Sequence, residues 1–349
     1  MTRHRPTVLL SAVAVLLAAV ALGACGKREE TGASTGTATA PKTTTNVDVM
    51  LDYLPNVDHA GLYAALDDGE FARAGLKVTP RVPGDAASPL KVLLAGKADM
   101  AISYEPELLL ARDKGAQLVS VAAIVQRPLT SIMSVDDKVQ EPADLKGTSV
   151  GTAGIPYQSA YLKTILGDAS VPASSVKEIN VGFNLIPAML TKKVDATLGA
   201  FWNVEGVQLR LDKKKPAIIP VDEAGVPTYD ELVLVVRKTF AEDNGPTIRR
   251  FIQALSRGTD AVKANPDLGV DALMKADPSL DRKTLAAQLK ATLDASPPVF
   301  YPSKAKAPFG WQDPAEWEKF GAWMLDNALI DIAPSNGSIT NEFLPGEGI

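Results

Sequence analysis

The stretch LDYLPNVDHAGLY, residues 51–63, reads like the end of a buried strand followed by the start of a helix. Polar and aromatic side chains crowd the junction, among them Asp52, Tyr53, Asn56 and His59. Ligands of open α/β sheets bind outside the carboxyl ends of the strands, so this junction is a candidate wall of a ligand site. Asn and Asp also cap helices, so a plain turn before a capped helix explains the same residues. The rest of the chain bears on this choice.

Strand-like and helix-like segments alternate from residue 47 onward. Two such units followed by helices alone predict an α/β protein of two lobes with a cleft between them, and the βαβα order is typical of parallel sheets. We assign residues 47–135 plus 231–349 to the first lobe and residues 136–230 to the second. The predicted strands are 47–51, 76–82, 100–104, 118–125, 131–135, 148–154, 176–181, 196–201, 217–221 and 231–238, and the predicted helices are 59–69, 87–96, 105–115, 157–167, 184–193, 202–215, 246–265, 266–276, 282–295 and 314–329.

The amino terminus has the pattern of an export signal. A basic head precedes the apolar run of residues 8–22, which is short for a transmembrane helix. The run leads into Leu22-Gly23-Ala24-Cys25, which resembles a bacterial lipobox, although a plain secretory signal with a chance cysteine has a similar pattern. We therefore expect residues 1–25 to be a signal with lipid attachment at Cys25. Residues 26–46 lack large apolar side chains and predict a flexible tether, so the body is expected to be exported and anchored by lipid to the outer face of the cell membrane.

The composition argues against several classes of function. The net charge of −5 and the mixed charge pattern do not favour nucleic acid as a partner. Cys25 is the only cysteine, so the body can hold no internal disulfide and no cysteine-based metal site. His59 is the only histidine after the signal, and neither a P-loop nor a nucleophile elbow is present. We expect a monomer with no catalytic residues, no metal and no cofactor.

Aromatic, acidic and amide side chains follow several other predicted strands. Flat rings stack on aromatic faces, and carboxylates accept strong hydrogen bonds from an amine or a protonated ring nitrogen. These loops hold few Lys or Arg residues, so a phosphate or sulfonate ligand is not expected. Each aromatic residue alone is more often core than ligand contact, but aromatic residues recur at four strand ends. The candidates beyond the opening stretch are Ser88, Ser103, Tyr104, Glu105, Tyr157, Asn184, Phe201, Trp202 and Glu205.

Three further stretches, ADMAISYEPELLLAR (98–112), VQRPLTSIMS (125–134) and VGFNLIPAMLTKKVDATLGAFWNVEG (181–206), resemble the substrate-binding lipoproteins of bacterial ABC importers for thiamine pyrimidine precursors. The opening stretch is similar to the W-x-P-N-x-x-H-x-x-L-Y-like first loop of that family, with Tyr53 where Trp is usual. The resemblance implies a type II periplasmic-binding-protein fold and delivery of a flat heteroaromatic ligand, of the formylaminopyrimidine or hydroxymethylpyrimidine type, to permease subunits. On this basis one wall of the cleft would hold Tyr53, Asn56 and His59, and the other Tyr157, Phe201, Trp202 and Glu205.

Other functions stay open at this point. Relatives within the resemblance bind riboflavin or other heterocycles. A fungal branch, the pyrimidine synthase, uses a Lys and a His in the stretch that matches residues 101–109, where this chain has neither. We therefore do not expect an enzyme. An exported sensor or structural lipoprotein with an empty cleft is the third alternative.

Overall fold

The computed structural model describes residues 44–135, 137–304, 306–333 and 337–346. The predicted signal, Cys25 and the tether up to residue 43 lie outside the described residues. Thr45 and Asn46, which we predicted as tether, belong to the first strand, because they pair in parallel with Leu76 and Lys77. Within the described ranges, no helix is both long and apolar enough to cross a membrane.

The first lobe is built on five strands: β1 (Thr45–Met50), β2 (Leu76–Arg81), β3 (Met100–Ser103), β4 (Leu118–Val125) and β10 (Leu232–Arg237). Their order in the sheet is β2-β1-β3-β10-β4. β1 is parallel to β2 and β3, but β10 is antiparallel to both β3 and β4. The sheet that we expected to be parallel is therefore mixed, because β10 returns from the second lobe and inserts between two strands of the first.

The second lobe has a sheet of the order β7-β6-β8-β5-β9. Its strands are β5 (Thr130–Ser134), β6 (Ser149–Thr152), β7 (Lys177–Asn180), β8 (Ala196–Phe201) and β9 (Ala217–Pro220). β5 pairs antiparallel with β8 and β9, so the lobe boundary lies between β4 and β5, and the prediction that placed it after residue 135 is wrong. Local sequence gives no information on which sheet a strand joins, since β4 and β5 are both buried along their whole length.

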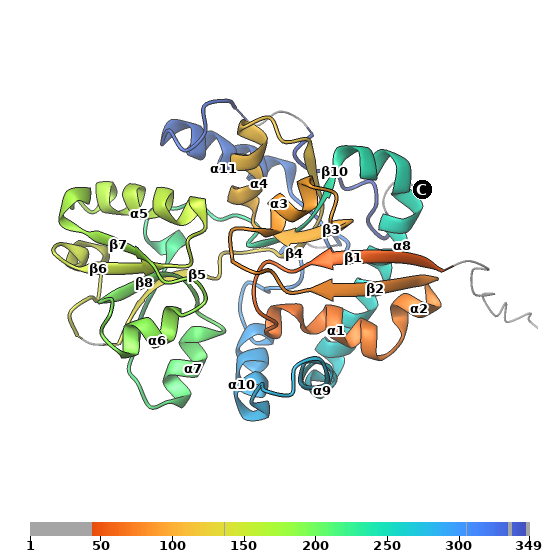
Figure 1. The fold of residues 1–349 in the computed structure, drawn as a ribbon, viewed down its shortest axis with the longest axis horizontal. Coiled ribbons are helices and arrows are strands. Elements are labelled where there is room, and N and C mark those ends of the chain that lie inside the picture. Colours follow the sequence, from red (N-terminus) through yellow and green to blue (C-terminus); the bar gives the residue numbers. More distant parts are fainter. Residues whose placement is uncertain (1–43, 136, 305, 334–336, 347–349) are drawn as a thin grey trace, which may run out of the picture. The chain divides into compact units, whose positions relative to one another are not determined.

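Helices cover both faces of each sheet (Figure 1). In the second lobe α5 lies on one face, and α6 and α7 lie on the other; in the first lobe α3 and α4 lie opposite α1. The helices are α1 (Ala60–Asp67), α2 (Glu70–Arg73), α3 (Pro89–Leu94), α4 (Glu105–Asp113), α5 (Pro156–Asp168), α6 (Leu185–Leu190), α7 (Glu205–Leu211), α8 (Lys238–Ala264), α9 (Pro266–Ala276), α10 (Arg282–Leu293) and α11 (Pro314–Asp326), with short 3₁₀ turns η1 (Val57–His59), η2 (Pro142–Leu145), η3 (Ala173–Ser175) and η4 (Val221–Glu223).

Two local features set the positions of the helices around the opening stretch. α8 begins eight residues before the predicted start at residue 246 and contains a kink at Asn244, just before Pro246, whose ring disfavours helical geometry in the preceding turn. α1 and α8 pack closely, because Gly61 has no side chain: a Cβ atom there would lie 2.2 Å from Thr259 Oγ1. This packing holds the segment that follows η1 against the first lobe.

Candidate functional site

The loop after β1 is held by hydrogen bonds within its own sequence. The Asn56 side chain accepts the backbone N–H of Asp58 at 2.8 Å and so caps η1. In return, His59 Nδ1 accepts the backbone N–H of Asn56 at 3.2 Å. The capped-turn interpretation of the opening stretch is therefore confirmed, and the same cap fixes the conformation of the loop that carries Tyr53.

A buried network supports this loop from below. Asp52 Oδ1 lies 2.8 Å from His59 Nε2, and Asp52 Oδ2 accepts the hydroxyl of Tyr104 at 2.8 Å. Because His59 Nδ1 accepts a backbone N–H, Nε2 carries the ring hydrogen and donates it to Asp52. All three side chains are buried. The side chains of Asp52, His59 and Tyr104 thus form a buried hydrogen-bonded cluster that supports the loop.

A cavity of about 500 Å³ lies in front of the loop, which is a usual size for a small-molecule site. Three candidates from the sequence line it: Tyr53, Asn56 and Glu205. Both lobes contribute to its walls. The remaining lining residues are Leu54, Pro55, Phe183, Leu185, Ile186, Pro187, Leu190, Val204, Gln208, Asp212, Asp277, Ser279 and Leu280.

Two aromatic rings meet in this cavity across the lobes. The rings of Tyr53 and Phe183 lie edge to face, with their centroids 4.7 Å apart and their planes at 88°. Phe183 was absent from our candidates, although the sequence shows it in the loop Gly182-Phe183-Asn184 after a predicted strand. The pair gives the cavity the flat apolar faces on which a planar ligand ring can pack.

Glu205 is one of three carboxylates that line the cavity, with Asp212 and Asp277, and it is the one that the sequence predicted as a site residue. It is the first residue of α7, and its Oε2 accepts the backbone N–H of Phe201 at 2.8 Å. Burial raises the pKa of Glu205 to about 7, against the lowering effect of this hydrogen bond and of its own backbone N–H. Burial also raises the pKa of Tyr53, and the negative charges of Glu205 and Asp52 raise it further. The cavity therefore combines a proton-accepting group with aromatic faces.

Three other predicted wall residues have partners away from this cavity. Tyr157 is buried, and its ring lies 5.4 Å from that of Tyr104, centroid to centroid. Phe201 is also buried. The indole Nε1 of Trp202 donates to the carbonyl of Pro128 at 3.2 Å, and the guanidinium of Arg127 lies over the indole ring. These contacts fill the space between the lobes rather than line the cavity.

Glu105 belongs to a separate carboxyl pair. Its Oε2 accepts the backbone N–H of Asp230 at 2.7 Å, and the Asp230 side chain accepts the indole N–H of Trp317 at 2.7 Å. Burial raises the pKa of both carboxyl groups. Among the remaining candidates, Ser88 bonds back to the carbonyl of Asp85, Ser103 is buried at the end of β3, and Asn184 is exposed at the start of α6. The structure does not bring these residues to the cavity.

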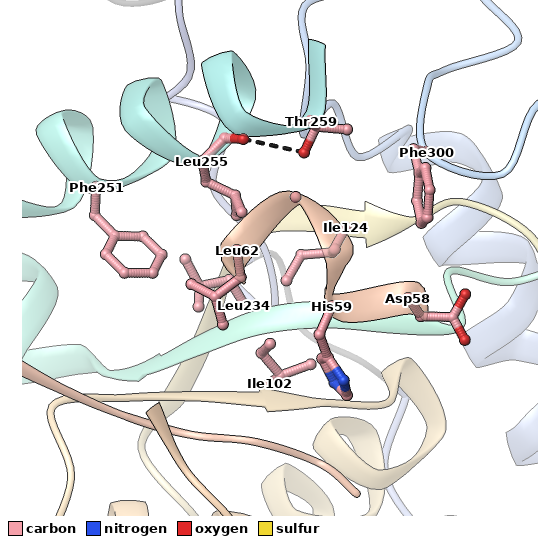
Figure 2. Close-up of a pocket in the computed structure, with 11 residues that line it drawn as sticks. Asp58, His59, Leu62, Ile102, Ile124, Leu234, Phe251, Leu255, Thr259 and Phe300 are labelled. Atoms are coloured by element: carbon pink, nitrogen blue, oxygen red, sulfur yellow. Dashed lines mark hydrogen bonds between the residues drawn. The ribbon is translucent and has the colours of Figure 1, made fainter. Parts of the chain in front are cut away.

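The described residues contain no group of three or more His, Cys, Asp or Glu side chains arranged to hold a metal ion. A second cavity of about 10 Å³ lies beneath α1 and has space for about one water molecule. It is lined mainly by apolar side chains, with Asp58, His59 and Thr259 at its margin (Figure 2). It is too small for an organic ligand. A third cavity of about 520 Å³, between the end of α4 and the start of α8, is lined by none of the predicted site residues. The cavity beside Tyr53, which three of them line, is therefore the candidate site.

Comparison with known proteins shows the family to which this chain is similar. A family model described as NMT1/THI5 like matches residues 56–268. The formylaminopyrimidine-binding protein of Halalkalibacterium halodurans is 31% identical over 317 residues, covering 89% of this chain and 92% of that protein. A Haemophilus influenzae protein named for thiamine biosynthesis is 34% identical over 234 residues, covering 67% and 74%.

More distant matches include an enzyme and solved structures with the same fold. A 4-amino-5-hydroxymethyl-2-methylpyrimidine phosphate synthase of Aspergillus parasiticus is 24% identical over 220 residues, covering 60% of this chain and 64% of that enzyme. The structure of the periplasmic aliphatic sulphonate-binding protein SsuA of Escherichia coli superposes with a TM-score of 0.62 at 16% identity, over 85% of this chain and 96% of that one. The expected two-lobed periplasmic-binding-protein fold is confirmed.

Proposed function

Because the chain belongs to the NMT1/THI5-like family, we propose that it is the solute-binding protein of an ABC importer that captures a thiamine pyrimidine precursor. The ligand we propose is an aminopyrimidine of the formylaminopyrimidine or hydroxymethylpyrimidine type. The protein delivers it to the permease subunits without changing it. The 31% identity to a formylaminopyrimidine-binding protein, which extends over 89% of this chain, supports the ligand class.

The observation that carries the proposal is the convergence of Tyr53, Phe183 and Glu205 on one cavity. An aminopyrimidine ring is flat, so it gains dispersion and quadrupole interactions from aromatic faces. Its exocyclic amine, and its ring nitrogen when protonated, can donate hydrogen bonds to a carboxylate, and hydrogen bonds to a charged group are the strong ones. The cavity lining contains no Lys or Arg, which agrees with a ligand that lacks phosphate or sulfonate.

We assign specific roles in ligand binding to Tyr53, Phe183 and Glu205. The edge-to-face contact of Tyr53 with Phe183 must open for a ring to enter, so the ligand replaces that contact with its own. Glu205 Oε2 is occupied by the N–H of Phe201, which fixes the carboxylate and directs its other oxygen to the ligand. Asn56 presents the edge of the capped loop, while Asp52 and His59 hold that loop in place.

The same family assignment and the amino-terminal sequence support a proposal for the cellular location of the protein. We propose export and lipid attachment at Cys25, with a monomeric body tethered at the outer face of the membrane. We also propose that the chain is no enzyme and uses no cofactor. This rests on the sequence, which lacks the Lys and His of the fungal synthase in residues 101–109, and on the binding-protein relatives that cover most of the chain.

The test is to measure binding by calorimetry and thermal shift for a panel of formylaminopyrimidine, hydroxymethylpyrimidine, thiamine, riboflavin, amino acids and alkanesulfonates. Because the correct ligand binds only the folded state, it raises the melting temperature of the protein by mass action. Mass spectrometry of the ligand after incubation should recover it unchanged. If only riboflavin binds, the ligand is another heterocycle and not a pyrimidine. If only sulfonates or amino acids bind, the proposal of an aromatic ligand is wrong. Conversion of the ligand to a product would identify an enzyme.

A further inference from the structure

Behind the cavity, one amide side chain of the second lobe is inserted between two groups of the first. Asn203, two residues after β8, is fully buried. Its Nδ2 donates to Asp58 Oδ1 in η1 at 2.8 Å and to Thr292 Oγ1 in α10 at 2.9 Å. A nearby contact of the same kind joins Gln288 Nε2 to the carbonyl of Val204 at 3.0 Å. These hydrogen bonds connect the lobes on the side of the cavity.

The hydrogen-bond directions fix how the Asn203 amide is oriented. The hydroxyl of Thr292 donates its hydrogen to the carbonyl of Gln288 at 2.8 Å, so its lone pairs are left to accept. The atom of Asn203 that faces Thr292 must therefore be the amide nitrogen. Both hydrogens of that nitrogen are then in use, and the amide oxygen of Asn203 is left to accept a hydrogen bond.

Two oxygens at this junction have no partner among the described residues: Asp58 Oδ2 and Asn203 Oδ1. A buried acceptor without a donor destabilises the folded protein. Asp58 and Asn203 already share one hydrogen bond, and a carboxylic acid and a primary amide can share two. A single hydrogen on Asp58 Oδ2 would supply the missing donor and satisfy both oxygens.

We propose that Asp58 is protonated when the lobes are closed, and that its paired hydrogen bonds with Asn203 form a latch that couples closure to the uptake of one proton. The latch adds two positioning residues to the binding site, and it rests on the proposed function in so far as closure captures a ligand. The cavity and the latch use the same two segments: Asn56 precedes Asp58 by two residues, and Glu205 follows Asn203 by two.

The charged groups around Asp58 are consistent with a neutral acid. Burial raises its pKa to about 7; the hydrogen bond from Asn203 and the electrostatic interaction with His59 lower it, and the charges of Asp52 and Glu205 raise it. Figure 2 shows the side chains of Asp58 and His59 pointing in different directions from η1. The ring hydrogen of His59 is donated to Asp52, so His59 does not supply the donor that Asp58 lacks.

The expected pH dependence follows from linkage. In an open protein Asp58 meets water and has an ordinary pKa of about 4, whereas in the closed protein it is raised to about 7. Between these values closure takes up a proton, so affinity contributed by the latch falls about tenfold per pH unit as pH rises. Below about pH 4 and above about pH 7 the contribution is constant.

The experiment compares the protein with Asp58→Asn, whose amide can donate to Asn203 Oδ1 and accept from Nδ2 at every pH. The probe is formylaminopyrimidine, titrated by calorimetry from pH 4.5 to 8. The ratio of the two affinities cancels the titration of Glu205 and of the ligand, which are common to both proteins. We expect this ratio to change at least tenfold in favour of Asp58→Asn as pH rises. Asp68→Asn, an exposed residue of the same lobe, is the matched control.

A second measurement needs no ligand. In carboxyl ¹³C NMR of the closed protein, the aspartate signal that is missing from Asp58→Asn should titrate near pH 7, separately from the signal of Asp230, whose pKa burial also raises. The free energy of unfolding of Asp58→Asn relative to the parent should rise with pH between about 4 and 7. If no heterocycle binds, the proposed function fails while these readouts still decide the latch. A flat affinity ratio together with Asp58 titrating near pH 4 would overturn it.

Discussion

The Glu231 carboxylate holds Thr130 at two points: Oε2 accepts the backbone N–H of Thr130 at 2.8 Å, and Oε1 accepts its hydroxyl at 2.8 Å. Oε2 also accepts the backbone N–H of Leu129 at 2.6 Å. Thr130 begins β5 on the outgoing connection between the lobes, and Glu231 precedes β10 on the returning one. One buried side chain therefore ties together the two segments about which the lobes must turn.

Removing this tie should destabilise the protein. Glu231→Ala leaves two buried N–H groups without an acceptor, so we expect the free energy of unfolding to fall by on the order of 3 kcal/mol. Glu231→Gln keeps one oxygen for those N–H groups and should lose less than half as much. Denaturant unfolding measures both, with the exposed Glu223→Gln as control. Equal stability of Glu231→Ala and the parent would show that the contact does not support the connections.

Glu205→Gln should weaken ligand binding more than it weakens the fold. Loss of a hydrogen bond to a charged acceptor costs about 1.5–3 kcal/mol, which is roughly a tenfold to hundredfold loss of affinity. If Glu205 only complemented the dipole of α7, the change would cost a little stability and no affinity. Calorimetry with formylaminopyrimidine distinguishes the two roles, and Glu223→Gln again controls for the loss of charge. An unchanged affinity would exclude Glu205 from the site.

The same residue predicts a pH dependence of opposite sign to that of Asp58. The pKa of Glu205 is raised to about 7 by burial, and the ligand hydrogen bonds need its charged form. Protonation therefore competes with binding as pH falls through the pKa that Glu205 has in the unliganded protein, and affinity should decline by up to tenfold per pH unit below it. Glu205→Gln should remove this decline. A decline of equal slope in the variant would assign it to the ligand or to another group.

The aromatic pair should matter through its rings rather than through the Tyr53 hydroxyl. Tyr53→Ala and Phe183→Ala each remove one face and should lower affinity roughly three- to tenfold. Tyr53→Phe keeps the ring, so its affinity should remain within about twofold of the parent. Calorimetry at one pH measures all three variants. A loss in Tyr53→Phe as large as that in Tyr53→Ala would mean that the hydroxyl, not the ring, contacts the ligand.

Asp52→Asn should be costly although it preserves shape. Asp52 accepts one hydrogen bond from His59 and one from Tyr104, so an amide NH₂ placed there must face a donor. We expect a loss of about 1–3 kcal/mol in the free energy of unfolding, and a weaker affinity because the loop with Tyr53 loses its support. Asp68→Asn, whose carboxylate is exposed, is the control. A neutral result would indicate that His59 or Tyr104 reorients at no cost.

Cys25→Ala should abolish membrane anchoring. The lipobox-like sequence at residues 22–25 predicts that the cysteine is lipidated and becomes the mature amino terminus. The variant should be released from the membrane or keep its signal uncleaved. Membrane fractionation and the intact mass of the protein measure this. Anchoring of the variant equal to that of the parent would show that another segment holds the protein at the membrane.

Elements with strong local signals were predictable from the sequence. β8 and α9 have the predicted bounds, 196–201 and 266–276, because a short apolar run and an Asn265 cap with Pro266 at the first turn are local properties. The predicted helix at 202–215 is shorter, since α7 starts only at Glu205, whose side chain returns to the N–H of Phe201. The capping turn around Asn56 was likewise visible in the sequence.

Pairings between distant residues were decided only by the tertiary structure. The sequence pointed to Tyr53, Asn56 and Glu205 as site residues. It did not show that Phe183 contacts Tyr53, or that Asn203 contacts Asp58, 145 residues away. The return of β10 into the first sheet and the placement of β5 in the second have the same origin. Hydrophobic periodicity and helix capping depend on residues within a few positions of one another, so they can be recognised in the sequence. The choice of a partner strand or side chain depends on how the whole chain packs, and no short stretch carries that information.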